Sequence, residues 1–251
     1  MAITRASRPV NNAIYDELDE RWYEAQDDPI ALLRAESACR TPWIAEQIQA
    51  RFGARASVLD IACGAGFLSN AVAREGHAVT GIDASERGLA VAARHDSTHS
   101  VRYVLGDALQ LPFEGESFDV ACAMDFLEHV ENPDAVVAEA ARVLVPGGLF
   151  FFHTFNRTFW AWLVVIKGVE WFVKNTPRDL HAFRLFLTPG ELRSMCAAHR
   201  MTVHELRGLE PAFPSAALVR LMLSGTVPKD FAFRFTKSTS TGYTGVAVKE
   251  R

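Results

Sequence analysis

The stretch Val58–Phe67, VLDIACGAGF, decides the predicted fold of this chain. Its first half, Val58–Ala62, is mostly apolar and is typical of a buried strand, and the glycines Gly64 and Gly66 follow it closely. Glycine allows the backbone to turn tightly and to approach a ligand closely. A helix predicted over Phe67–Arg74 completes a strand–turn–helix unit.

The same unit repeats along the chain. Further strands are predicted at His77–Asp83, Val101–Asp107, Phe118–Met124 and Leu149–Phe155. Ser85 is placed to cap the helix after the second strand, and Asn132 to cap another that begins at Pro133. Strands that alternate with helices predict an α/β fold with a parallel, doubly wound sheet. Apolar strands fit that sheet, because helices cover both of its faces.

The flanking regions predict a helical cover and an insertion within one domain. Thr188 and Glu191 have the spacing of a capping box, which predicts a helix start, and closing strands are expected at Thr202–Leu209 and Gly242–Lys249. The simplest division has four parts: an N-terminal helical cover (1–50), a ligand-binding core (57–156), an aromatic helical insertion or lid after the fifth strand (157–187), and a C-terminal helix with closing strands (188–251).

Composition excludes several protein classes. The 251 residues carry 26 Lys and Arg against 30 Asp and Glu, a net charge of −4, which does not favour nucleic-acid binding. The four cysteines include no CxxC pair, so free thiols in a reducing compartment are expected. The first residues lack the apolar segment of a signal peptide, and no apolar run reaches the roughly 18–20 residues of a membrane span. A cytoplasmic protein is expected.

Three acids at the ends of successive predicted strands indicate a nucleoside-binding site. Asp60 lies in the first strand, Asp83 ends the second and Asp107 ends the third. A carboxylate at Asp83 is placed to accept hydrogen bonds from a ribose, and Asp107 is placed to bind an adenine amino group. A dinucleotide is the rival ligand, but Ser69 replaces the third glycine of that motif. Asp60 would repel a pyrophosphate and suits a cationic ligand, so we predict S-adenosylmethionine.

Several motifs resemble those of the class I S-adenosylmethionine-dependent methyltransferases. They are VLDIACGAG, VTGID, GDALQLPF, FDVACAMDFLEHV and the PGG turn at Pro146–Gly148. Over roughly residues 43–189 the chain is more narrowly similar to the ubiquinone-biosynthesis O-methyltransferases, whose acceptors are demethylubiquinol-type polyprenyl catechols. The segments specific to that family are MDFLEHV (124–130), FFHTFNR (151–157), the aromatic helix, and LHAFRLFLTP (180–189).

The resemblance implies a Rossmann-like sheet of seven strands and adds contacts to the cofactor site. It implies cofactor contacts for Arg40, for the ribose acid Asp83 and for Met124, and it places Ala62 where the family has a glycine. Together with the residue-based assignments, the predicted cofactor site is Arg40, Asp60, Ala62, Gly64, Gly66, Asp83, Ala84, Asp107, Ala108 and Met124. The family's double tryptophan reads Trp22-Tyr23 here, and residues 211–229 have no clear counterpart.

The predicted reaction needs a group that removes the acceptor's proton. A phenol has a pKa near 10, so a base or a metal ion helps at neutral pH. Asp125, Glu128 and His129 follow the fourth strand, and we predict that they bind a divalent ion such as magnesium or zinc, or that Glu128 or His129 acts as the base. The alternative is that they only orient the loop. His181 is a second candidate base.

Further residues are expected to line the acceptor pocket. They are His153 and Asn156, at the end of the fifth strand, and Trp160. Trp160 lies in a very aromatic segment, residues 159–174, which also carries Lys167 and Lys174. Two interpretations of this segment stay open: a core helix that covers the pocket, or an interfacial helix that contacts a membrane on its inner face.

The predicted function is methyl transfer from S-adenosylmethionine to a phenolic or catechol hydroxyl, on a quinone-precursor-like ring with an apolar chain. One alternative is an O-, N- or C-methyltransferase of a soluble secondary metabolite. Another is a protein that binds S-adenosylmethionine without turnover. The expected partner is a small aromatic acceptor and not a nucleic acid, and the oligomeric state is left open.

Overall fold

The computed structural model describes residues 12–53, 55–177 and 180–251. Its strands are β1 (Ser57–Ile61), β2 (Ala78–Asp83), β3 (Arg102–Leu105), β4 (Phe118–Met124), β5 (Leu144–Phe155), β6 (Met201–Pro211), β7 (Phe233–Thr236) and β8 (Gly242–Lys249). Its α-helices are α1 (Arg21–Glu24), α2 (Ile30–Phe52), α3 (Phe67–Arg74), α4 (Glu86–Arg94), α5 (Pro133–Val143), α6 (Phe159–Ala161), α7 (Val169–Phe172), α8 (Pro189–Ala198) and α9 (Ala216–Ser224). Shorter or irregular helical turns are η1 (Asn12–Glu17), η2 (Leu127–His129), η3 (Trp162–Gly168) and η4 (Phe183–Leu185).

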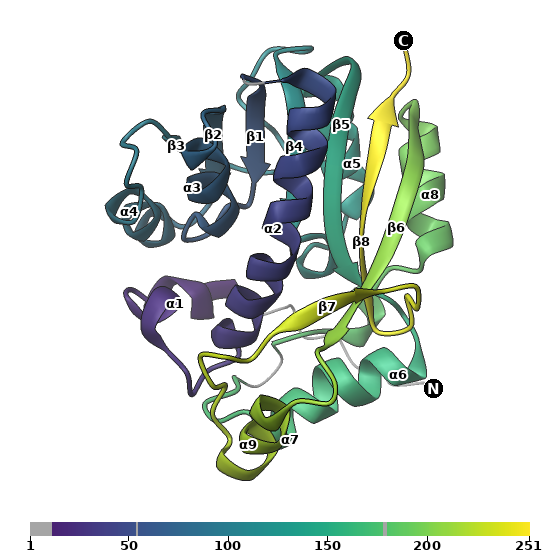
Figure 1. Ribbon diagram of the computed structural model, residues 1–251. Helices are drawn as coiled ribbons and strands as arrows, with labels where there is room; N and C mark the ends of the chain where they lie inside the picture. Colours follow the sequence, from purple (N-terminus) through teal and green to yellow (C-terminus); the bar gives the residue numbers. More distant parts are fainter. Residues whose placement is uncertain (1–11, 54, 178–179) are drawn as a thin grey trace, which may run out of the picture.

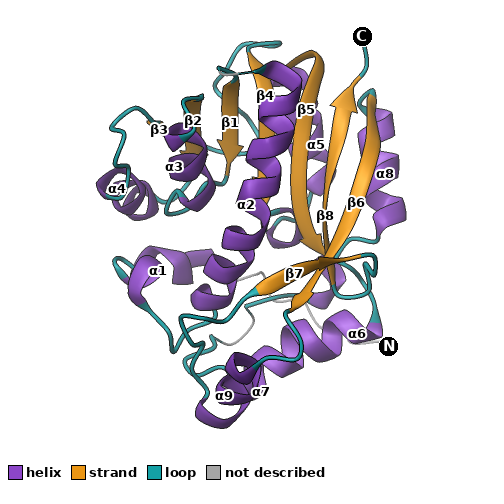
Figure 2. Ribbon diagram, viewed as in Figure 1, coloured by secondary structure: helices purple, strands orange, loops and turns teal. Residues whose placement is uncertain are grey.

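The strands form one sheet in the order β3-β2-β1-β4-β5-β8-β6-β7 (Figure 2). Strands β1 to β5 pair in parallel, whereas β8 runs antiparallel to β5 and β6, and β7 runs antiparallel to β6. The predicted doubly wound α/β fold is confirmed. The described residues contain eight strands instead of the seven expected, because the short β7 was not predicted.

Helices cover both faces of the sheet, as predicted. Successive side chains of a strand point to opposite faces, and β1 follows this rule with Val58 in one core and Leu59 in the other. The core that contains Val58 packs against α2 and α3, and the core that contains Leu59 packs against α5 and α8. Figure 1 shows α2 crossing the front of the sheet and α5 and α8 behind it.

Three predicted helix starts are confirmed by their hydrogen bonds. The Ser85 side chain accepts from the backbone N–H of Gly88, and the Asn132 side chain accepts from that of Ala135. Thr188 and Glu191 form the reciprocal capping box. Such caps stabilise a helix by about 1 kcal/mol each.

The fold opens a crevice at the carboxyl ends of the parallel strands. Strand β1 lies between β2 and β4, so the chain leaves toward opposite sides after β1 and after β4. Ligands of doubly wound sheets bind at this switch point. Figure 1 shows β1 pointing toward the end of the molecule that holds α1, α6, α7 and α9.

The insertion after β5 is helical, but it is not one regular helix. The helix predicted over residues 159–174 is α6, the π-helical turn η3 and α7 in succession, and it ends at Phe172. It packs against α9, which was not predicted, through a small core that includes Val173, Ala217 and Leu221. In residues 12–53, 55–177 and 180–251, no helix combines the length and the apolar character needed to cross a membrane.

Candidate active site

A large cavity occupies the crevice beneath β1, β2 and β4. Its volume is about 1620 Å³, larger than the roughly 300–1,000 Å³ that is typical of a small-molecule site. It therefore has room for a cofactor and an acceptor together. The predicted site residues on its wall are Arg40, Asp60, Ala62, Gly64, Asp83, Ala84, Asp107, Ala108, Met124, Asp125, Glu128, His129, His153 and His181.

Asp83 ends β2 with both carboxylate oxygens bonded to the backbone. One oxygen accepts from the N–H of Gly64 and the other from the N–H of Ser85, each at 2.8 Å. Burial raises the pKa of Asp83, and these N–H groups act against that rise. Because a carboxylate offers about four acceptor positions, two remain for the hydroxyls of a ribose.

Asp60 is buried in β1 and bonds to the first turn of α3. One of its oxygens accepts from the backbone N–H of Ser69 at 3.1 Å and from the Ser69 hydroxyl at 2.6 Å. Burial raises the pKa of Asp60 to about 7, although the Ser69 bonds oppose the shift. A cationic ligand in the cavity would favour the ionised carboxylate, since an opposite charge nearby lowers a carboxyl pKa.

The loop after β1 uses left-handed backbone conformations. Gly64 has φ +51°, and Ala62 takes φ 57° although it has a side chain. That conformation costs a non-glycine residue about 1–2 kcal/mol. A Cβ built on Gly64 would lie 3.0 Å from the Trp22 ring, so the glycine lets the N-terminal cover approach the loop.

The ends of β2 and β3 form an exposed side of the cavity. Asp107 is exposed, and its carboxylate accepts from the backbone N–H of Leu109 at 2.8 Å. Ala108 is buried beside it, while Ala84 is exposed after β2. This part of the wall can present a carboxylate and small side chains to a flat heterocycle.

The N-terminal cover closes the cavity near η2. Tyr15 stacks on Trp22 with ring centroids 5.7 Å apart and meets the His129 ring edge-on at 5.9 Å. The Ser85 hydroxyl donates to Asp16, which ties the cover to the loop after β2. Sequence reasoning gave the cover one site residue, Arg40, and missed Tyr15 and Asp16.

A buried ion pair joins the cover to the end of β4. Arg40 donates from both terminal nitrogens to the two oxygens of Asp125, one of them at 2.8 Å. Burial alone would raise the pKa of Asp125, but the charge and hydrogen bonds of Arg40, together with the nearby His153 and His129, outweigh burial, and the net pKa is lowered. Asp125 takes φ 54°, a strained conformation of the kind found at functional sites.

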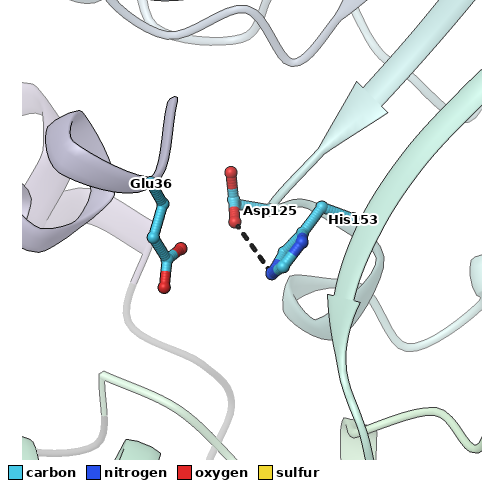
Figure 3. A group of neighbouring side chains, drawn as sticks. All are labelled: Glu36, Asp125 and His153. Atoms are coloured by element: carbon cyan, nitrogen blue, oxygen red, sulfur yellow. Dashed lines mark ion pairs between the residues drawn. The ribbon is translucent and has the colours of Figure 1, made fainter. Parts of the chain in front are cut away.

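Figure 3 shows Glu36, Asp125 and His153 facing one another from three elements. Their potential ligand atoms all lie within 4.8 Å, and His153 Nε2 is 3.6 Å from Asp125. Burial raises the pKa of Glu36 to about 8. Sequence reasoning missed Glu36, because nothing in the α2 sequence distinguishes it from other acids.

The three predicted metal ligands do not form a cluster of close ligand atoms in the described residues. Of Asp125, Glu128 and His129, only Asp125 belongs to the group of close ligand atoms found among the described residues. The guanidinium of Arg40 binds both Asp125 oxygens. A divalent cation at Asp125 would face that buried positive charge, so the arrangement does not fit a resident metal ion.

Glu128, His129 and His181 form the wall beyond β4. Burial, followed by the Asp125 charge, raises the pKa of Glu128 to about 8. Burial lowers the pKa of His129 to about 4 and that of His181 to about 3. The two imidazole rings lie 5.3 Å apart, and these pKa values make both of them neutral but weak bases at pH 7.

Three predicted site residues do not line the cavity. Gly66 is the N-cap residue of α3 at φ 78°, and a Cβ there would meet the Tyr103 hydroxyl at 2.5 Å, so packing explains this glycine. The Asn156 side chain donates to the carbonyl of Thr239 at 2.7 Å, which fixes the neighbouring loop. Trp160 lies on the surface, 59% exposed.

The far part of the cavity wall is apolar and comes from the insertion and α9. It includes Val164, Val169, Trp171, Phe172, Leu218, Leu221 and Met222. The sequence signals for α9 are Ser215 at its N-cap, which accepts from Leu218 N–H, and Gly225 after its end at φ 71°. They could have revealed the helix, but not that it lines the cavity.

Comparisons with known proteins agree with this geometry. A methyltransferase domain family matches residues 59–152. The ubiquinone biosynthesis O-methyltransferase of Pseudomonas fluorescens (strain SBW25) is 37% identical over 203 residues, 78% of this chain and 84% of its own length. That of Paracidovorax citrulli is 36% identical over 206 residues, 80% and 85% of the two chains.

Solved structures share the fold. Magnesium protoporphyrin IX methyltransferase from Synechocystis PCC 6803, crystallised with SAH, aligns over 96% of both chains with a TM-score of 0.65 and 16% identity. A putative methyltransferase from Bacillus halodurans gives a TM-score of 0.61 and 23% identity over 83% of this chain and 98% of its own. The curated relatives, which match over most of their length, place the chain more narrowly: it belongs to the ubiquinone biosynthesis O-methyltransferase family and is an S-adenosylmethionine-dependent methyltransferase.

Proposed function

We propose that one cavity brings S-adenosylmethionine and a catechol-type acceptor with an apolar chain together, and that the methyl group passes to a ring hydroxyl. The observation that carries this proposal is the continuity of the cavity from Asp83 to α9, because its wall changes from carboxylates to apolar side chains along the way. A polar cofactor and a ring with a hydrocarbon chain match the two ends.

The cofactor end fits the chemistry of S-adenosylmethionine. The free acceptor positions on Asp83 suit the ribose hydroxyls, and Asp107 and Ala108 suit the adenine. Asp60 supplies a carboxylate that a cationic ligand would ionise. Ala62, Gly64 and Ala84 also line this end of the cavity, and the proposal places Met124, at the end of β4, nearest the acceptor.

Arg40 would hold the cofactor's carboxylate, as its family position implies. Its guanidinium already binds Asp125, so cofactor binding and the Asp125 ion pair share one side chain. The buried pair keeps Arg40 positioned, which reduces the side-chain entropy lost on binding.

The bound cofactor supplies a methyl group on a sulfonium, which is already a good leaving group. The protein therefore has to align the acceptor oxygen and take its proton. His129 and His181 are neutral bases on the wall beyond Met124. Asp125 lies close enough to stabilise a protonated His129, since its charge raises the pKa of that imidazole. Glu128, with a pKa of about 8, is mostly protonated at neutral pH and can donate a hydrogen bond.

Acceptor comparison tests the proposal against the soluble-metabolite alternative. Labelled S-adenosylmethionine is incubated with a polyprenyl catechol, with a water-soluble catechol, or with no acceptor. We expect transfer to both catechols and a lower KM for the polyprenyl one. Preference for the soluble catechol would favour the alternative, and cofactor binding without any transfer would favour a non-catalytic protein.

We propose, as a second role, that α6 and its neighbours contact a membrane surface from which such an acceptor is taken. Phe159 and Trp160 are 63% and 59% exposed, and Trp171 on α7 is also exposed. Aromatic side chains beside lysines suit the interface with anionic lipids. Lys167 and Lys174 supply that charge, Lys167 while paired with Glu170.

Flotation with liposomes checks this role. The protein is expected to float with phosphatidylglycerol liposomes at low salt, and less with neutral ones. Replacing both Phe159 and Trp160 by serine should abolish flotation, whereas Arg193→Ser on α8 serves as a control outside this segment. Absence of the wild-type protein from the liposome fraction at low salt would mean that this surface serves another purpose.

A further inference from the structure

Four apolar side chains from η3, α7 and α9 both line the cavity and are exposed to solvent. They are Val164 (45% exposed), Trp171 (63%), Phe172 (37%) and Met222 (50%). Because these side chains come from separate elements, line the cavity and are also exposed to solvent, we infer that they surround an opening of the cavity. This opening is bounded by η3, α7 and α9, and we call it the α7–α9 portal.

A second group of side chains marks a different opening. Ala84, Asp107 and Leu109 are exposed and line the same cavity, but they follow β2 and β3. In Figure 1, β2 and β3 lie beside α3 and α4, while α7 and α9 lie together at the opposite end of the molecule. The cavity therefore has a polar opening near the proposed adenine site and an apolar opening remote from it.

Helix α9 gives the portal its inner wall. Leu218, Leu221 and Met222 line the cavity, and their spacing of three and four places them on one face of the helix. Val219 and Leu223 also lie four positions apart, are exposed at 56% and 83%, and do not line the cavity. One helix thus presents a cavity face and a solvent face, both apolar.

We propose that the hydrocarbon chain of the acceptor leaves the cavity through the α7–α9 portal, and that Leu218 and Met222 determine which chains are accepted. This inference rests on the proposed function, because it assumes that the acceptor ring lies near His129. An apolar rim favours methylene or isoprenoid groups over charged or hydrated ones. Each buried methylene contributes roughly three- to fourfold in affinity, so longer chains bind more tightly until they pass the rim.

The test compares two acceptors in the presence of S-adenosylhomocysteine, which prevents turnover. Binding of 4-methylcatechol and of 4-dodecylcatechol, kept below its aggregation concentration, is measured by equilibrium dialysis. The wild-type protein is expected to bind 4-dodecylcatechol at least a hundredfold more tightly. Met222→Glu and Leu218→Glu should each reduce this preference at least tenfold. Leu223→Glu, on the solvent face of the same helix, should leave the preference as in the wild type.

Two results would overturn the portal. One is a wild-type protein that binds both catechols equally well. The other is an equal loss of preference in Leu223→Glu and Met222→Glu, which would indicate chain binding on the outer surface of α9. Methyl transfer measured in parallel separates the two proposals. Chain-dependent binding that Met222→Glu removes, without any transfer in the wild type, would sink the proposed function and keep the portal. Methyl transfer to both catechols, without tighter binding of 4-dodecylcatechol, would keep the proposed function and reject the portal.

Discussion

Replacing His129 or Glu128 by alanine is expected to lower the turnover number by about 10²–10⁴-fold, the usual contribution of a positioned acid or base. Both residues are buried on the cavity wall beyond β4. Neither belongs to the part of the wall proposed for the ribose and the adenine, so S-adenosylmethionine affinity should change little. Single-turnover kinetics measure the chemical step, and calorimetric titration measures cofactor binding in the same variants.

The pH dependence distinguishes the two bases. The pKa of Glu128 is raised to about 8, so a Glu128 base would give a rate that rises with pH and levels off near pH 8. The pKa of His129 is lowered to about 4, so a His129 base is already neutral and gives little pH dependence between pH 6 and 8. We expect the His129 profile, because Glu128 carries its proton at neutral pH.

Treatment with a chelator tests whether turnover requires the predicted metal ion. Since Arg40 binds both oxygens of Asp125, we expect turnover to survive treatment with a chelator. Loss of activity that returns with magnesium or zinc would mean that Asp125 exchanges Arg40 for a cation when the cofactor is bound. Normal turnover in both alanine variants would make the cluster structural, and the base would then be His181 or the acceptor's own ionised oxygen.

The second large effect is expected at Asp83. Its two remaining acceptor positions would form charge-assisted hydrogen bonds to the ribose, each contributing about 1.5–3 kcal/mol. Loss of one such bond corresponds to at least tenfold in affinity, so Asp83→Ala should weaken S-adenosylmethionine binding by more than tenfold. Calorimetric titration checks this, with thermal unfolding measured to show that the variant is folded.

Asp83 also binds the backbone of the loops after β1 and β2, so two control variants are needed to separate cofactor binding from loop structure. Asp83→Asn keeps an oxygen that can accept from Gly64 or Ser85 but loses the charge, so an intermediate affinity is expected. Glu86→Ala removes an exposed acid of α4 outside the cavity and should bind the cofactor normally. If Asp83→Ala binds S-adenosylmethionine with unchanged affinity, Asp83 does not bind the cofactor.

The parts of the fold that local rules govern could be predicted from the sequence. Strand β4 and helix α3 have the predicted bounds, because an apolar strand and the glycine before a helix are local features of the sequence. Asp60 and Asp83 were placed on one edge of the sheet because parallel strands bring their carboxyl ends together. Strand β7 was not predicted, since its four residues pair with β6 only through tertiary contacts.

The parts of the site that depend on distant contacts could not be predicted. Arg40 and Asp125 are 85 positions apart, and no spacing rule connects them. Asn156 was expected in the pocket because it ends β5, but a carbonyl on the loop before β8 binds its side chain. The sequence also does not reveal which face of α9 meets the cavity, because both faces are apolar.

The central claim, methyl transfer to oxygen at this cavity, is tested most directly by the fate of an isotopic label. The protein is incubated with S-adenosylmethionine carrying a ¹³C-methyl group and with a polyprenyl catechol, and the product is analysed by NMR. The label is predicted to appear in a single aryl methoxy group and to form at least a hundredfold more slowly when His129→Ala replaces the wild type. A label bonded to carbon, or no labelled product from a protein that binds both ligands, would contradict the account.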